Sequence, residues 1–256
     1  MMVGECIYCG YSGEGLQTEH IIPYSFSEKN SEGDVLLKAS CDNCAKITKA
    51  IEQFVTQELF GNIRKVFSLR SRRGELPKVV EQKITDMDGT VQNIMVPVED
   101  LKDMIFLPVL GLPGMANNNP AQVDCGLSEI ITINVGLKRD GKFYIDNRVD
   151  YFHVQTQFRD KNFEKFLLKI GYCTAIKNFG IDSVRNSPIP KILLGYDKRY
   201  GAFLGKFPHD FIDIPPSDQS WLQYGSYETA KGIVSSVRLF AAVEGTPEYH
   251  IIITLR

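Results

Sequence analysis

Two Cys-x-x-Cys pairs lie near the start of this 256-residue chain, Cys6-Ile7-Tyr8-Cys9 and Cys41-Asp42-Asn43-Cys44. Four thiolates in this pattern supply zinc with a complete tetrahedral ligand set, so the site they predict is structural and has no open position for water. Disulfides or free thiols are the alternative. We favour a metal because a repeated Cys-x-x-Cys is typical of metal sites in a reducing compartment and no signal peptide precedes it. Cys125 and Cys173 stand alone in the sequence and are expected to be buried or inert.

A carboxylate and an imidazole lie side by side between the two pairs, at Glu19 and His20. We expect a short strand at residues 16–20, a second strand at 34–40 and a helix from Cys41 onward. Neighbouring residues of a strand point to opposite faces, so one side chain can hold a divalent cation while the other takes a proton from water. The pair therefore has the two groups that metal-assisted hydrolysis needs.

The order of these motifs resembles the HNH, or ββα-metal, endonucleases: Cys-x-x-Cys, then Glu-His-Ile-Ile-Pro at 19–23, then Ala-Ser-Cys-x-x-Cys opening a helix. The resemblance covers roughly the first third of the chain. It implies that Glu19 ligates a catalytic Mg²⁺ or Mn²⁺ ion, that His20 is the general base for the attacking water, and that the four cysteines bind zinc. An acidic residue before a histidine is common by chance, and the position between the cysteine pairs is what makes this one informative.

One position departs from the family's pattern. Zinc-bearing members usually carry an asparagine or histidine directly after the fourth cysteine, as a further ligand of the catalytic metal, whereas this chain has Ala45. Thr48 and Glu52 lie on the same helical face, and Asn43 lies inside the second pair, so each is a candidate replacement. Glu52 stands about 10 Å along the helix axis from Ala45, although its side chain leans back toward the N-terminus. A solvent-facing Glu52 is the alternative, and it would leave a weakened or inactive metal site.

Positive charge is concentrated directly after the nuclease-like motif. The cations are Arg64, Lys65, Arg70, Arg72 and Arg73. Such a cluster can contact phosphates on both sides of a scissile bond. A solvated basic surface is the alternative, because no base-reading motif lies beside it.

The composition, with 43% hydrophobic residues, provides material for a sizeable core in one large domain or two modest ones. The net charge of -2 argues against a protein that coats DNA, but a local basic face remains compatible with it, because affinity for phosphate depends on where the cations lie. No apolar run approaches the roughly 20 residues that cross a bilayer, and the N-terminus lacks the design of a signal peptide. We therefore expect a cytoplasmic protein with no membrane partner.

We expect an α+β fold in three parts: a zinc-stapled HNH-like module at 1–75, a β-hairpin and connecting loop at 76–122, and an α+β domain of unknown role at 123–256. The hairpin is predicted at 78–84 and 90–96, and the proline- and glycine-rich residues 107–122 are predicted to form an irregular surface loop. The helix from Cys41 should end near 61–62. Its expected apolar stripe consists of Ile47, Ile51, Phe54, Val55 and Leu59.

In the last part, strands are predicted at 130–135, 142–145, 151–158, 232–243 and 249–255. A helix capped by Asp160 should end at Gly180 and bury a face formed by Phe163, Phe166, Leu167, Ile170 and Thr174. The histidines outside the motif have no partner at metal-like spacing and are expected to be structural or at the surface; they are His153, His209 and His250. Three aromatic residues could stack bases, although packing is favoured: Trp221, Tyr224 and Tyr227.

Together these patterns predict a metal-dependent endonuclease that hydrolyses phosphodiester bonds in DNA, with the C-terminal domain contacting substrate, a protein partner or a second copy of the chain. The same chemistry would permit RNA as a substrate. A nuclease module beside an unfamiliar second domain is most like bacterial or phage defence machinery. The alternative is a catalytically weakened or inactive zinc-knuckle module that binds nucleic acid or acts as a scaffold.

Overall fold

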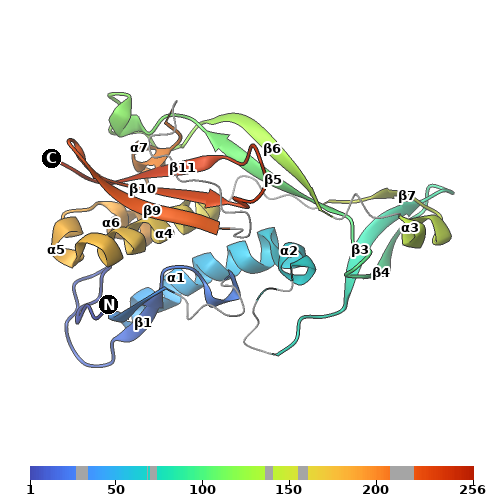
Figure 1. Ribbon diagram of the computed structural model, residues 1–256, viewed down its shortest axis with the longest axis horizontal. Helices are drawn as coiled ribbons and strands as arrows, with labels where there is room; N and C mark the ends of the chain where they lie inside the picture. Colours follow the sequence, from blue (N-terminus) through green and yellow to red (C-terminus); the bar gives the residue numbers. More distant parts are fainter. Residues whose placement is uncertain (27–33, 68, 70–73, 136–140, 155–160, 208–221) are drawn as a thin grey trace.

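The computed structural model describes residues 1–26, 34–67, 69, 74–135, 141–154, 161–207 and 222–256. Within these residues the fold is mixed α+β, as predicted, with strand orders β1-β2, β4-β3-β7, β5-β6 and β8-β11-β10-β9 (Figure 1). The strands are β1 (Gln17–His20), β2 (Val35–Ser40), β3 (Val79–Asp86), β4 (Val91–Pro97), β5 (Asp103–Leu110), β6 (Leu127–Val135), β7 (Val149–Phe152), β8 (Leu204–Gly205), β9 (Leu222–Thr229), β10 (Gly232–Leu239) and β11 (Glu248–Leu255). The α-helices are α1 (Asp42–Phe54), α2 (Gly61–Val66), α3 (Lys142–Asp146), α4 (Lys161–Phe179), α5 (Ile181–Val184), α6 (Ile189–Leu193) and α7 (Tyr200–Phe203).

The N-terminal part has the predicted order of two strands and a helix. β1 and β2 are antiparallel, with Glu19 opposite Leu36, and the register shifts between Gln17 and Glu19. The extra residues of this bulge lie in β2, where Lys38 has a φ of 49°. The bulge receives the N-terminal segment, because the Val3 N–H donates to the Leu37 carbonyl. The N-terminal segment therefore pairs with the bulged residues of β2.

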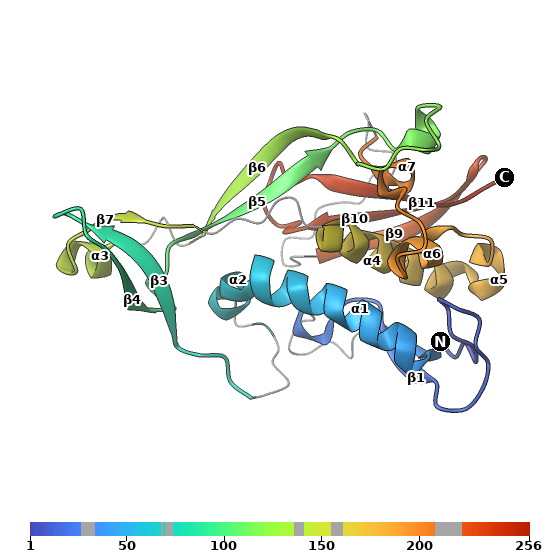
Figure 2. The ribbon, with the colours of Figure 1, turned by 180° about the vertical axis from the view of Figure 1, so that it is seen from behind.

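Helix α4 forms the central layer of the molecule. It packs on the β9-β10-β11 face on one side and against α1 on the other (Figures 1 and 2). Its buried residues surround the helix and are not confined to one stripe, and they include the predicted Phe163, Phe166, Leu167, Ile170 and Thr174. Burial on all sides follows from having layers on both faces. One hydrophobic core consequently runs from the N-terminal Cys6 to Ile253 of β11.

A smaller unit formed by β3, β4, α3 and β7 lies at the end of the long axis opposite the two chain termini (Figure 1). It has its own small core of Val80, Val96, Leu101 and Tyr144. The β5–β6 hairpin connects this unit with the central layers, and its register pairs Leu107 with Ile131. That pairing joins residues on both sides of the predicted boundary at position 122.

Several predicted elements are wrong. Residues 107–122 do not form only a surface loop, because β5 extends to Leu110 and buries Leu107. Residues 142–145 belong to helix α3 and not to a strand. Strand β7 (149–152) overlaps the predicted strand at 151–158 only at residues 151–152. Residues 155–158 of that prediction and the predicted cap Asp160 lie outside the described residues. Ile47 is exposed, and the buried residues of α1 are Cys44, Thr48 and Ile51. Strand β9 was not predicted.

The helix that begins after Cys41 ends close to the predicted position. α1 continues as a π-helical turn, Val55–Leu59, before α2 begins at Gly61. Among the described residues, no helix is long and apolar enough to span a bilayer.

Candidate metal centre and hydrolytic site

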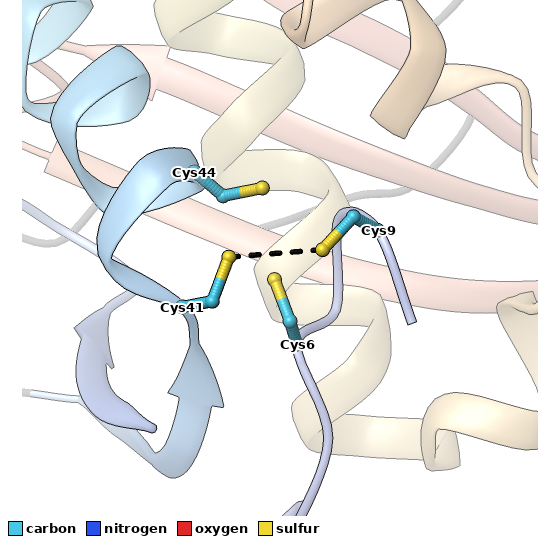
Figure 3. A group of neighbouring side chains, drawn as sticks. All are labelled: Cys6, Cys9, Cys41 and Cys44. Atoms are coloured by element: carbon cyan, nitrogen blue, oxygen red, sulfur yellow. Dashed lines mark hydrogen bonds between the residues drawn. The ribbon is translucent and has the colours of Figure 1, made fainter. Parts of the chain in front are cut away.

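The two Cys-x-x-Cys pairs converge on one point, as predicted. The Sγ atoms of Cys6, Cys9, Cys41 and Cys44 all lie within 4.8 Å of one another (Figure 3). Cys9 and Cys41 have their sulfurs 3.7 Å apart. Tetrahedral zinc with Zn–S bonds of about 2.3 Å requires sulfurs about 3.8 Å apart, so the four thiols are positioned to hold a metal ion such as zinc. All four are free cysteines and none forms a disulfide.

Backbone geometry explains why the first pair can turn toward the second. Gly10 has a φ of 76°, a conformation that favours glycine, and its N–H donates to the Cys6 carbonyl at 2.8 Å. The knuckle is tied to β2 by a hydrogen bond from the Ile7 N–H to the Ala39 carbonyl at 2.8 Å. Tyr172 of α4 donates its hydroxyl to the Ile7 carbonyl, also at 2.8 Å. The cluster therefore links the N-terminal segment, the ββ hairpin, α1 and α4.

Within the cluster, the thiols differ in acidity. Burial raises the pKa of Cys41, but hydrogen bonds from the Cys44 N–H and from neighbouring thiols outweigh that effect and bring the pKa to about 7. Burial is also the largest cause that raises the pKa of Cys44 and of Cys9. The thiolate is the form that binds a metal, so Cys41 loses its proton more readily than Cys9 or Cys44.

The Glu-His pair lies at the end of β1, and its two side chains have different environments. Glu19 is buried, with 6% of its surface exposed, whereas His20 is half-buried. Their alternation follows from the period of the strand. The His20 ring lies edge-on to Tyr24, with the ring centroids 6.4 Å apart. Of the two, His20 is therefore the more exposed side chain.

A buried lysine, which the sequence reasoning missed, holds this pair. Lys169 of α4 is fully buried, and its Nζ lies 3.0 Å from Glu19 Oε1 and 2.7 Å from Glu52 Oε1. The same Nζ donates to the carbonyl oxygens of His20 and of Ile21, the latter at 3.2 Å. Burial lowers the pKa of Lys169, but the charges of Glu52 and Glu19 outweigh it and hold the pKa above its usual value. Lys169 is thus a buried ammonium ion bound by oxygen atoms of the β1 end and of α1.

The candidates for the missing ligand at Ala45 have other partners or positions. The Thr48 hydroxyl is buried and donates to the Cys44 carbonyl at 3.3 Å. Asn43 is exposed beside the cysteine cluster. Glu52 faces Lys169 through Oε1 and is not solvent-facing as the alternative prediction had it, since 21% of its side chain is exposed. Among the described residues, the four cysteines are the only group of three or more His, Cys, Asp or Glu side chains arranged to hold a metal.

The predicted basic cluster is described only in part. Arg64 and Lys65 lie in α2 and are half-buried, whereas Arg70, Arg72 and Arg73 lie outside the described residues. Arg64 Nε donates to the Ser25 carbonyl at 3.2 Å, and Lys65 Nζ donates to Asn62 Oδ1 at 3.2 Å. Burial is the largest cause that lowers the pKa of both side chains. Both cations are therefore held close to the protein surface and are not fully extended into solvent.

The other singled-out side chains have structural surroundings. Cys125 and Cys173 are buried, as expected, and burial is the main reason that the pKa of Cys173 rises to about 12. His153 is exposed, with Nε2 2.8 Å from Thr85 Oγ1, and His250 is buried in β11. His209 and Trp221 lie outside the described residues.

Tyr224 is half-buried and donates its hydroxyl to Asp34 Oδ2 at 2.6 Å, and Tyr227 is also half-buried. Asp34 Oδ1 lies 2.5 Å from Lys177 Nζ of α4, so this carboxylate joins the ββ hairpin to both β9 and α4. The surroundings of Tyr224 are those of a packed side chain, with its hydroxyl used inside the protein.

Comparison with known proteins adds no relative: no family model, no curated protein and no solved structure matches the chain.

Proposed function

We propose that the chain is an HNH-type endonuclease that hydrolyses phosphodiester bonds in DNA. The observation that supports this proposal is the accessible His20 at the end of β1, directly after a buried Glu19, in a ββα arrangement whose helix begins at the four-cysteine cluster. A half-buried imidazole is a suitable general base, because it can reach both solvent water and the protein groups that orient it. In this proposal the cluster holds zinc, which stabilises the module and takes no part in the reaction.

The proposed reaction also uses a divalent cation, Mg²⁺ or Mn²⁺. Glu19 is the side chain that would hold it, and Lys169 already contacts one of its oxygens, Oε1. Magnesium keeps several waters and relies on substrate phosphates when a site has few carboxylates, so the donor set fits a weakly held ion. When bound, the ion would polarise the phosphate and stabilise the leaving 3′-oxygen. His20 would take the proton from the attacking water, and cleavage would leave a 5′-phosphate.

Substrate contacts are proposed for the basic cluster, of which Arg64 and Lys65 are described. Half-buried cations near the surface suit phosphate contacts, which position a nucleic acid without selecting its sequence. We further propose a cytoplasmic role in bacterial or phage defence. The C-terminal part, 123–256, would then contact a protein partner or a second copy of the chain.

The experiment that tests this function is nicking of supercoiled plasmid DNA by the zinc-loaded protein in the presence of Mg²⁺ or Mn²⁺. We expect cleavage by the wild type and a loss of about 10²–10⁴-fold in His20→Ala, the usual contribution of a general base. His153→Ala is the matched control, because His153 is exposed and lies in a different sheet region. Parallel reactions with single-stranded RNA of the same sequence decide the substrate class.

A second function is favoured by one observation. Lys169 engages both acidic side chains that could bind a catalytic cation, which would suit a module that has lost its metal and keeps a binding or scaffolding role. Zinc-loaded wild type that binds DNA but does not cut DNA or RNA with either cation would establish this alternative. Equal binding by wild type and His20→Ala would accompany that result.

A further inference from the structure

The ammonium group of Lys169 lies among four oxygens at the end of β1. Two of them are carboxylate oxygens, from Glu19 and Glu52, and two are main-chain carbonyl oxygens, from His20 and Ile21. With the two carboxylate oxygens accepting from two of its three N–H groups, the ammonium directs the third at the main-chain carbonyl oxygens. These carbonyl oxygens belong to the main chain of the proposed general base and of the next residue.

We propose that Lys169 is a positioning residue that holds the backbone of His20 and Ile21 and the carboxylate of Glu19 in the geometry required for hydrolysis. Glu52 is then the second counter-charge of Lys169 and not a ligand of the catalytic cation. This inference rests on the proposed nuclease function for its catalytic consequence, but not for the placement of the ammonium.

Lys169 binds the main chain of His20 and Ile21 from helix α4. Lys169 projects from α4, which packs against both α1 and the C-terminal sheet, so its own position is fixed by the core. On the other edge of the turn, the Ile21 N–H donates to the Asp34 carbonyl at 2.9 Å. The peptide that links His20 to Ile21 is therefore bound by α4 at its carbonyl and by the chain entering β2 at its N–H. Such bonds fix the main chain while leaving the imidazole half-exposed.

Charge alone provides a competing explanation, and variants can separate the two. The wild-type group of two carboxylates and one ammonium carries a net charge of -1. Lys169→Met would leave the buried Glu19 and the partly buried Glu52 without a counter-charge, and this variant can fail to fold for that reason alone. The double variant Lys169→Met/Glu52→Gln restores the net charge of -1 but provides no donor for the two carbonyl oxygens. Lys165→Met on the same helix is the matched control, since the Lys165 Nζ lies over the Tyr200 ring at 6.0 Å.

The test compares wild type, the double variant, Lys169→Arg and the control for zinc content, plasmid cleavage and hydrogen exchange of the Ile21 amide. In the double variant we expect full zinc content, faster Ile21 exchange and kcat lower by about 10²-fold, the loss that a misplacement of about 1 Å can cause. The KM for DNA should be unchanged, because Lys169 is buried and does not reach the substrate. Lys169→Arg keeps the charge and donors, so it should recover part of kcat, and Lys165→Met should match the wild type.

Two outcomes would overturn the inference or the function separately. If the double variant has the kcat and the Ile21 exchange rate of the wild type, Lys169 serves only to balance charge. Its positioning role is then overturned, and the nuclease function is unaffected. If the wild type does not cut nucleic acid, the proposed function fails, and the exchange rate of Ile21 alone then decides whether Lys169 holds the strand end.

Discussion

Removal of one ligand of the cysteine cluster is expected to unfold the N-terminal part of the molecule. Cys44→Ala is the most informative change, because Cys44 is buried in the first turn of α1 and only 4% of its surface is exposed. Its thiol group faces the other three sulfurs (Figure 3). Loss of this ligand releases α1 from the knuckle at Cys6–Cys9 and exposes the start of the helix.

The size of the effect follows from the position of the cluster. Structural zinc contributes about 10–16 kcal/mol of apparent binding free energy at neutral pH, which is comparable with the whole unfolding free energy of about 5–15 kcal/mol for a typical domain. The cluster here also anchors Ile7 and Tyr8, which are both buried in the shared core. Loss of the bound ion therefore destabilises part of the core as well as the local loop. Cys44→Ala is expected to prevent cooperative folding of the ββα segment.

The assay is elemental analysis of the purified protein together with urea unfolding followed by far-ultraviolet circular dichroism. We expect one zinc ion per wild-type chain, none in Cys44→Ala, and a collapse of the unfolding transition on chelation. Cys125→Ala is the matched control, because it removes a buried thiol outside the cluster and should cost on the order of 1 kcal/mol. Wild-type protein that folds fully without stoichiometric metal would refute the reasoning.

Three further predictions concern charge and the catalytic cation. Burial raises the pKa of Asp34, but hydrogen bonds from its partners on α4 and β9 outweigh burial and lower the pKa below its usual value. The difference in unfolding free energy between wild type and Asp34→Asn should therefore be constant at pH 5–8 and should shrink as the pH falls below about 4. Urea unfolding at a series of pH values measures this difference. Neutralising Arg64 and Lys65 together should weaken binding to all DNA sequences alike. The slope of log K against log salt concentration should fall by about 0.9 for each phosphate that the protein no longer neutralises. An unchanged slope in a binding titration would assign both side chains to a structural role. In metal titrations of cleavage, Ala45→Asn should lower the Mg²⁺ concentration required, and Glu52→Gln should lower kcat without changing that requirement; a large rise in the requirement for Glu52→Gln would instead make Glu52 a metal ligand.

Local pattern predicted the elements that contain the proposed site. The order of two strands and a helix and the long helix ending at Gly180 depend on neighbours in sequence, and both are present. The convergence of the four cysteines was predicted from the repeated Cys-x-x-Cys spacing, and it is present as well. Residues 107–110 were missed because Pro108 argues against a strand. β5 tolerates this proline as a member of a two-stranded pair, in which one edge of the strand needs no N–H donor from it.

Other errors came from interactions between distant segments. Residues 142–145 were predicted to form a strand, but Tyr144 belongs to a short helix and donates its hydroxyl to Gln82 Oε1 at 2.7 Å. Lys169 was missed for a similar reason, since its carboxylate partners are more than a hundred positions away in the sequence. One signal was available: Lys169 lies three residues after Phe166 and four before Cys173, so a charged residue stands on the apolar face of the helix. A lysine at such a position needs a buried acidic partner.

The most direct test of the central claim is chemical rescue of His20→Ala by imidazole in a plasmid-cleavage assay. The account predicts that free imidazole restores part of the missing activity in His20→Ala, in proportion to its unprotonated fraction, and has no effect on wild type or on His153→Ala. Cleavage by His20→Ala at the wild-type rate without imidazole would contradict the assignment of His20 as the general base.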